Sequence, residues 1–232
     1  MTALICGSMA YDTIMVFHDR FKNHILPEQV HILNVSFLVP EMRRNFGGCA
    51  GNIAYNLKLL GGSGLPMGAV GKDFAPYANW LDAHGIERSG LLEIPEEFTA
   101  QAYITTDQDD NQITAFHPGA MNHAHLNRVA DIPDVSIGIV SPDGREGMLE
   151  HAGQFFEAGI PFIFDPGQGM PMFDADALRR FVHQATWLAF NDYEAKLMSE
   201  RTGLSMEDLA GMAEAVVVTR GGKGSRDRKS VV

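Results

Sequence analysis

Five short apolar runs separated by helical segments constrain the fold of this sequence more than any other feature. The runs, each bounded by turn residues, cover residues 3–6, 138–140, 161–164, 187–190 and 215–219. Uninterrupted apolar runs of this length are typical of strands buried on both faces. Between two of them, Met148, Ala152 and Phe155 recur at helical spacing, and Ser205 with Asp208 is spaced as a helix capping box. This alternation predicts an α/β fold with a mostly parallel sheet flanked by helices.

Two segments lack that alternation of strands and helices. Side-chain types alternate within residues 12–46 and 99–118, notably in HILNVSFLV (31–39), which indicates strands. The sequence DQDDN (107–111) between two such runs indicates a hairpin turn. We expect both segments to form a small β-sheet lid on a single domain covering residues 1–232. Such a lid closes over a substrate and excludes water.

Charge and cysteine content exclude several classes of partner. The net charge of −11 disfavours nucleic acid and anionic membranes as main partners. The two cysteines, Cys6 and Cys49, are too few for a disulfide framework, so we expect a reduced, cytoplasmic protein. The first residues do not read as a signal peptide, and no apolar run is long enough to cross a membrane. We therefore expect neither a nucleic-acid nor a membrane partner.

A glycine-rich stretch, NFGGCAGNIAYNLKLLGG (45–62), precedes and enters an apolar helix. Gly47, Gly48 and Gly51 permit close backbone approach and positive φ, and the amides and dipole of the helix that begins there favour the polar oxygens of a ligand. The alternative is a tight strand-to-helix turn with Asn52 as the helix cap. The spacing alone leaves both interpretations open.

Three polar residues at predicted strand ends are candidates for binding. Asp12 follows the first strand, where its carboxylate could accept hydrogen bonds from both hydroxyls of a vicinal diol, although a turn residue is the alternative. Asn191 and Glu194, in FNDYE, stand about one turn apart where a strand ends and a helix begins. They could hold magnesium through water, or they could form only a capping box.

The sequence VVVTRGGKGS (216–225) runs from a buried strand into a glycine turn. Thr219, Gly221 and Gly224 offer a hydroxyl and bare amides to nucleotide phosphates, although the spacing differs from that of the Walker loop. A plain hairpin turn is the alternative interpretation.

Two further groups lie near these candidates. In DPGQGM (165–170), Asp165 and Gln168 follow another predicted strand and would line the same crevice, unless the segment is an ordinary surface loop. Near the lid, Phe116, His117 and Met121 could form a wall for a ring, or Phe116 could belong to the core and His117 could be a hydrogen-bonded polar group without a catalytic role.

Together these motifs resemble the ribokinase-like (PfkB) carbohydrate and nucleoside kinases. GGCAGNIA, followed by six residues to Gly61 and nine more to Gly71, is similar to the first signature of that family. NDYE resembles its NxxE motif, and VTRGGKG resembles its nucleotide loop. The resemblance covers essentially the whole chain. Within the family, RFKNHILPEQVHILNVSFLV (20–39) and ITAFHPGAM (113–121) look most like adenosine kinases of bacterial type.

The resemblance implies phosphoryl transfer from ATP, assisted by Mg²⁺, to the 5′-hydroxyl of a ribose. The substrate residues it implies are Asp12, Gly48 and Asn52 for the sugar hydroxyls and Ser36, Phe116 and Gln168 for the purine. For ATP and its metal, it implies Asn191, Thr219, Gly221 and Gly224 as phosphate ligands and Glu194 as the metal ligand. It also raises the expectation of a homodimer formed through the lid.

One departure concerns the catalytic base. The family places this Asp in a GxGD motif after the nucleotide loop, and no GxGD occurs in the 232 residues. Four charged residues, 226–229, stand where an apolar strand is expected. The resemblance places Asp73, in VGKDF, at the start of a helix, so we expect it to be the helix cap or an acid in the first turn and no substitute for the base. We therefore expect a C-terminally incomplete kinase, truncated or frameshifted, that is weak or inactive because catalysis of phosphoryl transfer depends on positioning and charge stabilisation.

Two other functions remain open at this stage. One is a kinase for a different sugar or nucleoside, such as ribose, fructose or inosine. The other is a noncatalytic module that binds a nucleoside.

Overall fold

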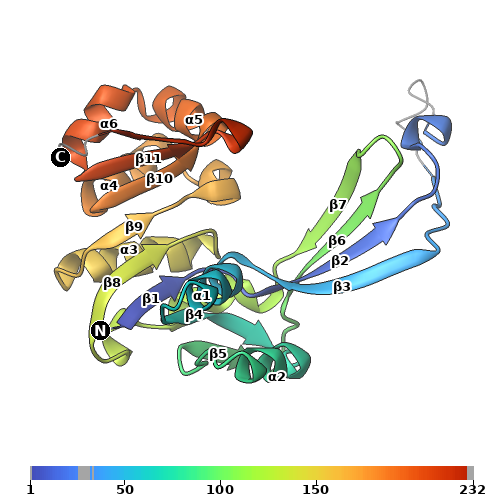
Figure 1. Ribbon diagram of the computed structural model, residues 1–232, viewed down its shortest axis with the longest axis horizontal. Coiled ribbons are helices and arrows are strands. Elements are labelled where there is room, and N and C mark those ends of the chain that lie inside the picture. The colour runs from blue at the N-terminus through green and yellow to red at the C-terminus, as the bar shows by residue number, and fades with distance from the viewer. Residues whose placement is uncertain (1, 26–31, 33, 229–232) are drawn as a thin grey trace.

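The computed structural model of this protein describes residues 2–25, 32 and 34–228, and the larger of its two sheets forms the body of the molecule (Figure 1). That sheet has the strand order β12-β11-β10-β9-β8-β1-β4-β5. Its strands are β1 (Thr2–Cys6), β4 (Gly64–Gly71), β5 (Leu91–Ile94), β8 (Val135–Val140), β9 (Phe162–Phe164), β10 (Trp187–Asn191), β11 (Ala215–Thr219) and β12 (Ser225–Arg228). All neighbours pair in parallel except β11 and β12. The predicted α/β fold with a mostly parallel sheet is confirmed.

Helices complete the body and bury both faces of its sheet. They are α1 (Cys49–Leu59), α2 (Ala75–Ala83), α3 (Arg145–Glu157), α4 (Ala175–Gln184), α5 (Asp192–Thr202) and α6 (Met206–Met212). Successive side chains of a strand point to opposite faces, so in β1 Leu4 belongs to the core cluster that includes residues of α3 to α6, whereas Ile5 belongs to the cluster that includes residues of α1 and α2. The capping box predicted at α6 is confirmed, because Ser205 Oγ accepts a hydrogen bond from the Asp208 amide (3.1 Å).

Short 3-10 helices connect several of these elements. They are η1 (Phe21–Asn23), η3 (Gly119–Leu126), η4 (Val129–Asp131), η5 (Gly167–Met172) and η6 (Gly221–Lys223). The charged segment that begins at Arg226 continues the sheet as β12, an exposed edge strand antiparallel to β11. Edge strands tolerate charged side chains because one of their sides faces water. Lys229, the last of the four charges, lies outside the described residues.

The smaller sheet, which we call the lid sheet, projects from the body as a long blade (Figure 1). Its strand order is β3-β2-β6-β7. The strands are β2 (Ala10–Val16), β3 (Glu41–Gly47), β6 (Ala100–Thr106) and β7 (Gln112–His117). The predicted hairpin is confirmed, because β6 and β7 pair antiparallel and the amide of Asp107 donates to the carbonyl of Asn111 (3.1 Å).

The strand expected over residues 31–39 is wrong for the described part of that segment. Residues 34–40 form no strand, while 26–31 and 33 lie outside the described residues. Side chains 34–40 still alternate between exposed and half-buried, because Phe37 packs on the rings of Phe17 (4.8 Å) and Phe21 (5.0 Å). The alternation that indicated a strand therefore reflects an extended segment that packs on aromatic rings without a strand partner.

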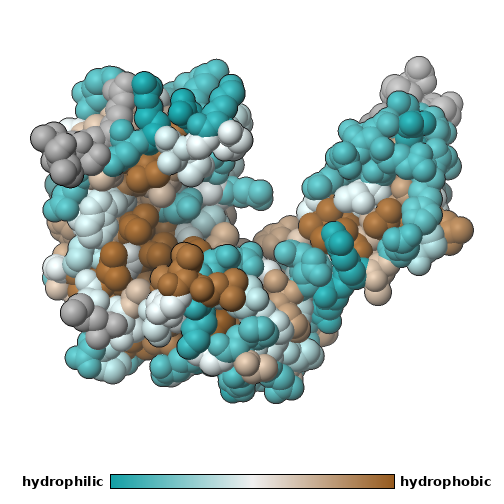
Figure 2. Space-filling view, viewed as in Figure 1, coloured by the Kyte–Doolittle hydropathy of each residue, from teal (hydrophilic) through white to brown (hydrophobic). Residues whose placement is uncertain are grey.

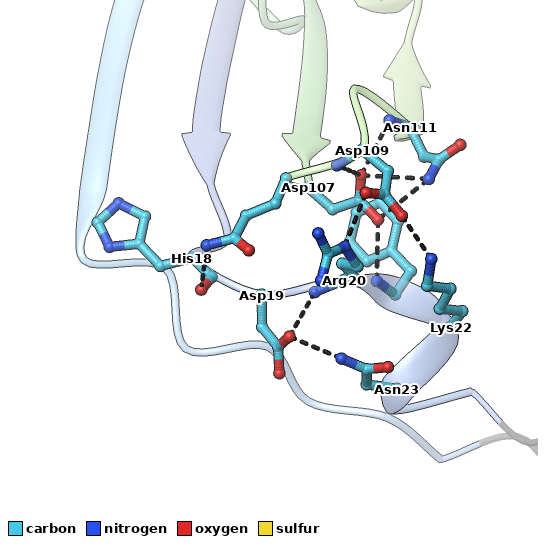
Figure 3. Close-up of polar contacts among 10 residues, drawn as sticks. His18, Asp19, Arg20, Lys22, Asn23, Asp107, Asp109 and Asn111 are labelled. Atoms are coloured by element: carbon cyan, nitrogen blue, oxygen red, sulfur yellow. Dashed lines mark hydrogen bonds and ion pairs between the residues drawn. The ribbon is translucent and has the colours of Figure 1, made fainter.

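Polar contacts fix the tip of the lid sheet (Figure 3). Burial alone would raise the pKa of Asp107, but hydrogen bonds from Phe21, Asn111 and Asp109 outweigh it and lower that pKa to about 2. Asp109 also binds Arg20 (2.7 Å) and Lys22 (2.8 Å). These contacts join η1 and its flanking residues to the β6–β7 turn.

Candidate functional site

The strand order of the body reverses beside β1. From β1 the chain passes through β4 and β5 to one edge of the sheet, and it then returns to β8 and continues toward the other edge. Such a reversal leaves a crevice at the carboxyl ends of the two strands, where ligands bind in α/β sheets. Hydrogen bonds join the two strand ends, from the Ser141 amide to the Cys6 carbonyl (2.9 Å) and from the Ser8 amide to the Pro142 carbonyl (3.0 Å).

The glycine-rich stretch lies directly over this crevice, at the start of α1. Gly48 precedes the helix with φ +86°, and a Cβ there would overlap the Ser8 carbonyl. Ser8 also binds two amides of the first turn, through Oγ to Cys49 (3.1 Å) and through its carbonyl to Ala50 (3.0 Å). Part of the helix terminus that we expected to face a ligand is therefore occupied by Ser8. The backbone conformation itself requires glycine at position 48.

Asn52 does not cap α1. The residue at the cap is Gly48, and the exposed Asn52 lies inside the helix, with its amide donating to the Gly48 carbonyl (3.0 Å). The capping interpretation is wrong because the helix begins earlier than expected. Asn52 lies one turn after Gly48 in the helix, and its side chain remains a candidate for binding a ligand.

Asp12 lies within β2 of the lid sheet, so the alternative of a turn residue after the first strand is wrong. A Cβ on Gly47 would overlap the Asp12 carboxylate, so this glycine makes room for it. Gly51 likewise leaves space for the hydroxyl of Tyr77, which donates to the Gly47 carbonyl (2.9 Å). Burial raises the pKa of Asp12. The carboxylate is thus held half-buried next to the glycine-rich stretch.

The register of the lid sheet brings Asp12 and Phe116 onto one face. Asn45, Asp12, Ala102 and Phe116 stand opposite one another in a single row across the four strands. Residues paired in this way project on the same side, and adjacent strands are about 4.8 Å apart. The small Ala102 separates the carboxylate from the ring, and Phe116 is 52% exposed. The sequence indicated Asp12 and Phe116, but it did not indicate Asn45, because only the register reveals the row.

An open cleft separates this blade from the body (Figure 2). Ser36 is exposed in the segment 34–40, outside the four lid strands, and Gln168 is exposed in η5 directly after β9. Neither Ser36 nor Gln168 belongs to the row formed by Asn45, Asp12, Ala102 and Phe116.

The ends of β10 and β11 bring three predicted residues together. Asn191 stands opposite Thr219 in the parallel register. The capping box at α5 is confirmed, because Asn191 Oδ1 accepts from the Glu194 amide (2.8 Å) and Glu194 Oε2 accepts from the Asn191 amide (2.8 Å). That interaction leaves the second carboxylate oxygen of Glu194 for another partner.

Asp165 follows β9, and its carboxyl group is affected by the negative charge of Glu194. Burial and then the negative charge of Glu194 raise the pKa of Asp165 to about 6. A divalent cation between two such carboxylates would relieve their repulsion, and magnesium takes few protein carboxylates because it keeps water and phosphate ligands. The described residues contain no group of three or more His, Cys, Asp or Glu side chains arranged to hold a metal. Two carboxylates could hold magnesium here only if water or phosphate oxygens supply its other ligands.

Gly221 and Gly224 lie in the turn between β11 and β12, which confirms the hairpin interpretation. Both have positive φ, and a Cβ on either would meet no atom within 4 Å. Thr219 and both glycines are exposed. The turn is thus open to a ligand on the side where β10 and β11 end.

Two acidic residues have surroundings that the sequence did not predict. Asp73 does not cap α2, whose cap is Phe74, and its carboxylate instead accepts from the amide of Thr99 (2.8 Å). Asp143, which we had not singled out, is fully buried after β8 and accepts from the Gly144 amide (2.8 Å). Its other oxygen has no hydrogen-bond partner among the described residues, and burial raises its pKa to about 8. The turn sequence SPDG after an apolar run was the only available signal.

No helix in the described part of the chain is both long and apolar enough to span a bilayer.

Comparison with known proteins identifies relatives over nearly the whole chain. Residues 8–227 match the pfkB family of carbohydrate kinases. A nucleoside kinase from Methanocaldococcus jannaschii is 31% identical over 194 residues, which cover 83% of this chain and 64% of that relative. This chain thus spans less than two thirds of the length of that relative.

Solved structures show the same fold. A nucleoside kinase from Burkholderia thailandensis in complex with inosine superposes with a TM-score of 0.88 at 50% identity, over 100% of this chain and 74% of that one. The same enzyme in complex with ADP-inosine gives a TM-score of 0.85 at 53% identity, over 99% and 72% of the two chains. A ribokinase from Thermotoga maritima, at 19% identity, shares the fold with a TM-score of 0.77 over 100% and 76%.

The order of the motifs, the fold and the extent of the match agree with one another. The resemblance to the ribokinase-like kinases that the motifs indicated is confirmed, and this chain belongs to the pfkB family of carbohydrate kinases.

Proposed function

We propose that this protein is a nucleoside kinase that binds a purine nucleoside between the lid sheet and the body and phosphorylates its 5′-hydroxyl with ATP. The observation that carries the proposal is the row in which Asp12 and Phe116 share one face of the lid sheet. A carboxylate accepts hydrogen bonds from the two ribose hydroxyls, and an exposed ring two strands away stacks on a base. A sugar without a base would bind the Asp12 carboxylate and would make no use of the Phe116 ring.

Adenosine and inosine are the two candidate substrates. The segments 20–39 and 113–121 resemble bacterial adenosine kinases and favour adenosine. The B. thailandensis relative, which is 50% identical and was solved in complex with inosine, favours inosine. We propose that Gly48 and Asn52 lie beneath the ribose, that Ser36 and Gln168 bound the purine, and that residues 12–46 and 99–118 close as the lid.

The phosphate donor is assigned to the ends of β10 and β11. We propose that Asn191, Thr219 and the turn with Gly221 and Gly224 bind the phosphates of ATP, and that Glu194, with Asp165, holds Mg²⁺. The metal, when bound, neutralises charge on the transferring phosphoryl group. The protein residues orient the phosphates and exclude water. We assign the catalytic base to no residue of the 232, because none of them forms a GxGD motif.

Calorimetric titration of the purified chain with adenosine, inosine, ribose and fructose tests the proposal. We expect a nucleoside to bind at least about fivefold more tightly than either sugar, because base stacking adds about 1 kcal/mol or more. Phe116→Ala should remove most of that preference, whereas Phe156→Ala, which truncates a ring of similar exposure on α3, should not. Stronger binding of a bare sugar, or no nucleoside binding by the folded chain, would contradict the proposal.

Formation of ADP from Mg-ATP and nucleoside distinguishes a kinase from a noncatalytic module. We expect binding with little or no turnover from these 232 residues. Turnover well above the uncatalysed rate would mean that a carboxylate to which we assign another role acts as the base.

A further inference from the structure

The lid sheet has two chemically different faces, and one of them contacts the body at the base of the sheet. Asp12 and Phe116 belong to the face described above. The neighbouring residue in β2, Tyr11, points to the opposite face, where its ring packs on Phe46 and Tyr77 (5.9 Å between centroids in each case). This second face, near the base of the blade, rests on α2 and on the turn that precedes it.

Asp73, in that turn, contacts three of the four lid strands. Its carboxylate accepts from the Thr99 amide just before β6 (2.8 Å) and from Gln101 Nε2 within β6 (3.1 Å). Its Oδ2 pairs with Arg44 of β3 (3.5 Å). Its backbone carbonyl accepts from the Tyr11 hydroxyl of β2 (2.9 Å).

The partners of Asp73 also support one another. The Arg44 guanidinium lies over the ring of Tyr11, 3.8 Å from its centroid, which is the geometry of a favourable cation–π contact. Thr99 is fully buried and Gln101 is 7% exposed, so the bonds they donate to Asp73 are screened from water. A buried amide that loses its acceptor pays the full cost of desolvation. Asp73 is therefore the common acceptor that holds β2, β3 and β6 against the body.

We propose that Asp73 is a positioning residue that anchors the lid sheet and thereby sets where Asp12 and Phe116 meet a nucleoside. Two partners of Asp73 are direct neighbours of residues in the row. Tyr11 precedes Asp12 in β2, and Gln101 precedes Ala102 in β6. A shift at the base of the blade moves both binding side chains together, since the row is continuous across the sheet. The nucleoside-binding part of this inference rests on the proposed function, whereas the anchoring part does not.

Some links between lid and body do not involve Asp73. The Gly71 amide donates to Thr99 Oγ1 (3.0 Å), and the Lys72 amide donates to the Glu97 carbonyl (3.0 Å). Because these bonds remain, and because the Asp73 carbonyl that accepts from Tyr11 is kept in an alanine variant, Asp73→Ala should loosen the base of the lid without detaching it. Asp73→Asn should be milder, because its amide oxygen still accepts from Thr99, while the bond from Gln101 Nε2 and the charge that pairs with Arg44 are lost.

Two measurements on the full 232-residue chain test the inference. The first is amide hydrogen exchange without any ligand, comparing β2 and β6 with β8 to β10. For Asp73→Ala we expect exchange in β2 and β6 to accelerate about tenfold or more while the body strands keep their rates. The second is the Kd for inosine and adenosine by calorimetry, which we expect to rise about tenfold for Asp73→Ala and less than about threefold for Asp73→Asn.

Asp82→Ala is the matched control. Asp82 lies in α2, nine positions along the chain from Asp73, and binds Arg88 through two hydrogen bonds (2.7 and 3.0 Å) without contacting the lid. We expect it to change neither exchange in the lid nor nucleoside affinity. If Asp73→Ala does not fold, Gln101→Met, which removes one of the bonds to Asp73 and keeps that of Thr99, replaces it in both measurements.

Unchanged exchange in β2 and β6 would overturn the anchoring role. Accelerated exchange with an unchanged Kd would overturn the link to the nucleoside site. If the unmodified chain binds no nucleoside, the proposed function fails, and the exchange measurement still decides whether Asp73 anchors the lid.

Discussion

Asp143 gives this protein a pH dependence of stability that can be isolated by one substitution. Its side chain is fully buried at the crevice end of β8, with one oxygen bound to the Gly144 amide and the other unpartnered among the described residues. Burial raises its pKa to about 8, far above the value of a carboxyl in the unfolded chain. Between these two pKa values the folded state holds a proton that the unfolded state releases.

The direction and size of the effect follow from proton linkage. Because the folded state binds more protons, the free energy of unfolding falls as pH rises from about 4 to about 8, by up to about 1.4 kcal/mol per pH unit. Asp143→Asn removes the ionisation and keeps the shape of the side chain. Relative to this variant, the unmodified protein should lose about 2.5 kcal/mol between about pH 5 and about pH 7. Other acids, including Asp165, are present in both proteins and cancel in the difference.

Urea unfolding of both proteins at several pH values between about 5 and 8 measures this difference. Asp110→Asn, at an exposed position in the lid turn, controls for the loss of one negative charge from an acidic chain. A difference between the unmodified protein and Asp143→Asn that stays constant within about 0.5 kcal/mol would refute the assignment of a protonated, buried Asp143.

Three further predictions concern other parts of the crevice. Gly48→Ala should destabilise the protein by about 3 kcal/mol in urea unfolding, because φ +86° and the Ser8 carbonyl exclude a Cβ, whereas Gly153→Ala in α3, where a Cβ meets nothing within 4 Å, should be neutral or stabilising. Asn191→Ala should cost about 1 kcal/mol as a lost helix cap and also weaken Mg-ATP binding in calorimetry; equal ATP affinity would limit Asn191 to capping. Cys49, whose pKa its partial burial raises to about 11, should react with iodoacetamide at about pH 8 roughly a hundredfold more slowly than a free cysteine peptide, and a reaction at the free rate would contradict the raised pKa.

Much of the body was predictable because most of its strands are rich in apolar residues. The five apolar runs correspond to β1, β8, β9, β10 and β11, whereas the deeply buried β4 was missed because Gly and Pro interrupt its apolar sequence. The lid was harder to predict, because a sheet with exposed faces carries mixed side chains. In β7 all six residues are exposed, and β2 and β3 were not located within the predicted segment.

Local motifs were interpreted correctly where one backbone segment decides the outcome. The capping box of Asn191 with Glu194 and the hairpin at residues 107–111 depend on neighbours within a few positions. Asn52 was wrongly predicted to cap α1, because the helix begins earlier, at Gly48. Asp73 was wrongly predicted to act at the start of α2, because its carboxylate binds Thr99, which is distant in the sequence.

Apolar runs and short motifs, which act over a few positions, were enough to predict the α/β body, the family resemblance and most of the candidate residues. The folded chain was needed to show that Asp12 and Phe116 share a face, that Asp73 contacts three lid strands, and that Asp143 is buried after β8. These facts depend on strand register and on contacts between residues far apart in the chain. Register is set by packing of whole faces, which no local stretch of sequence encodes.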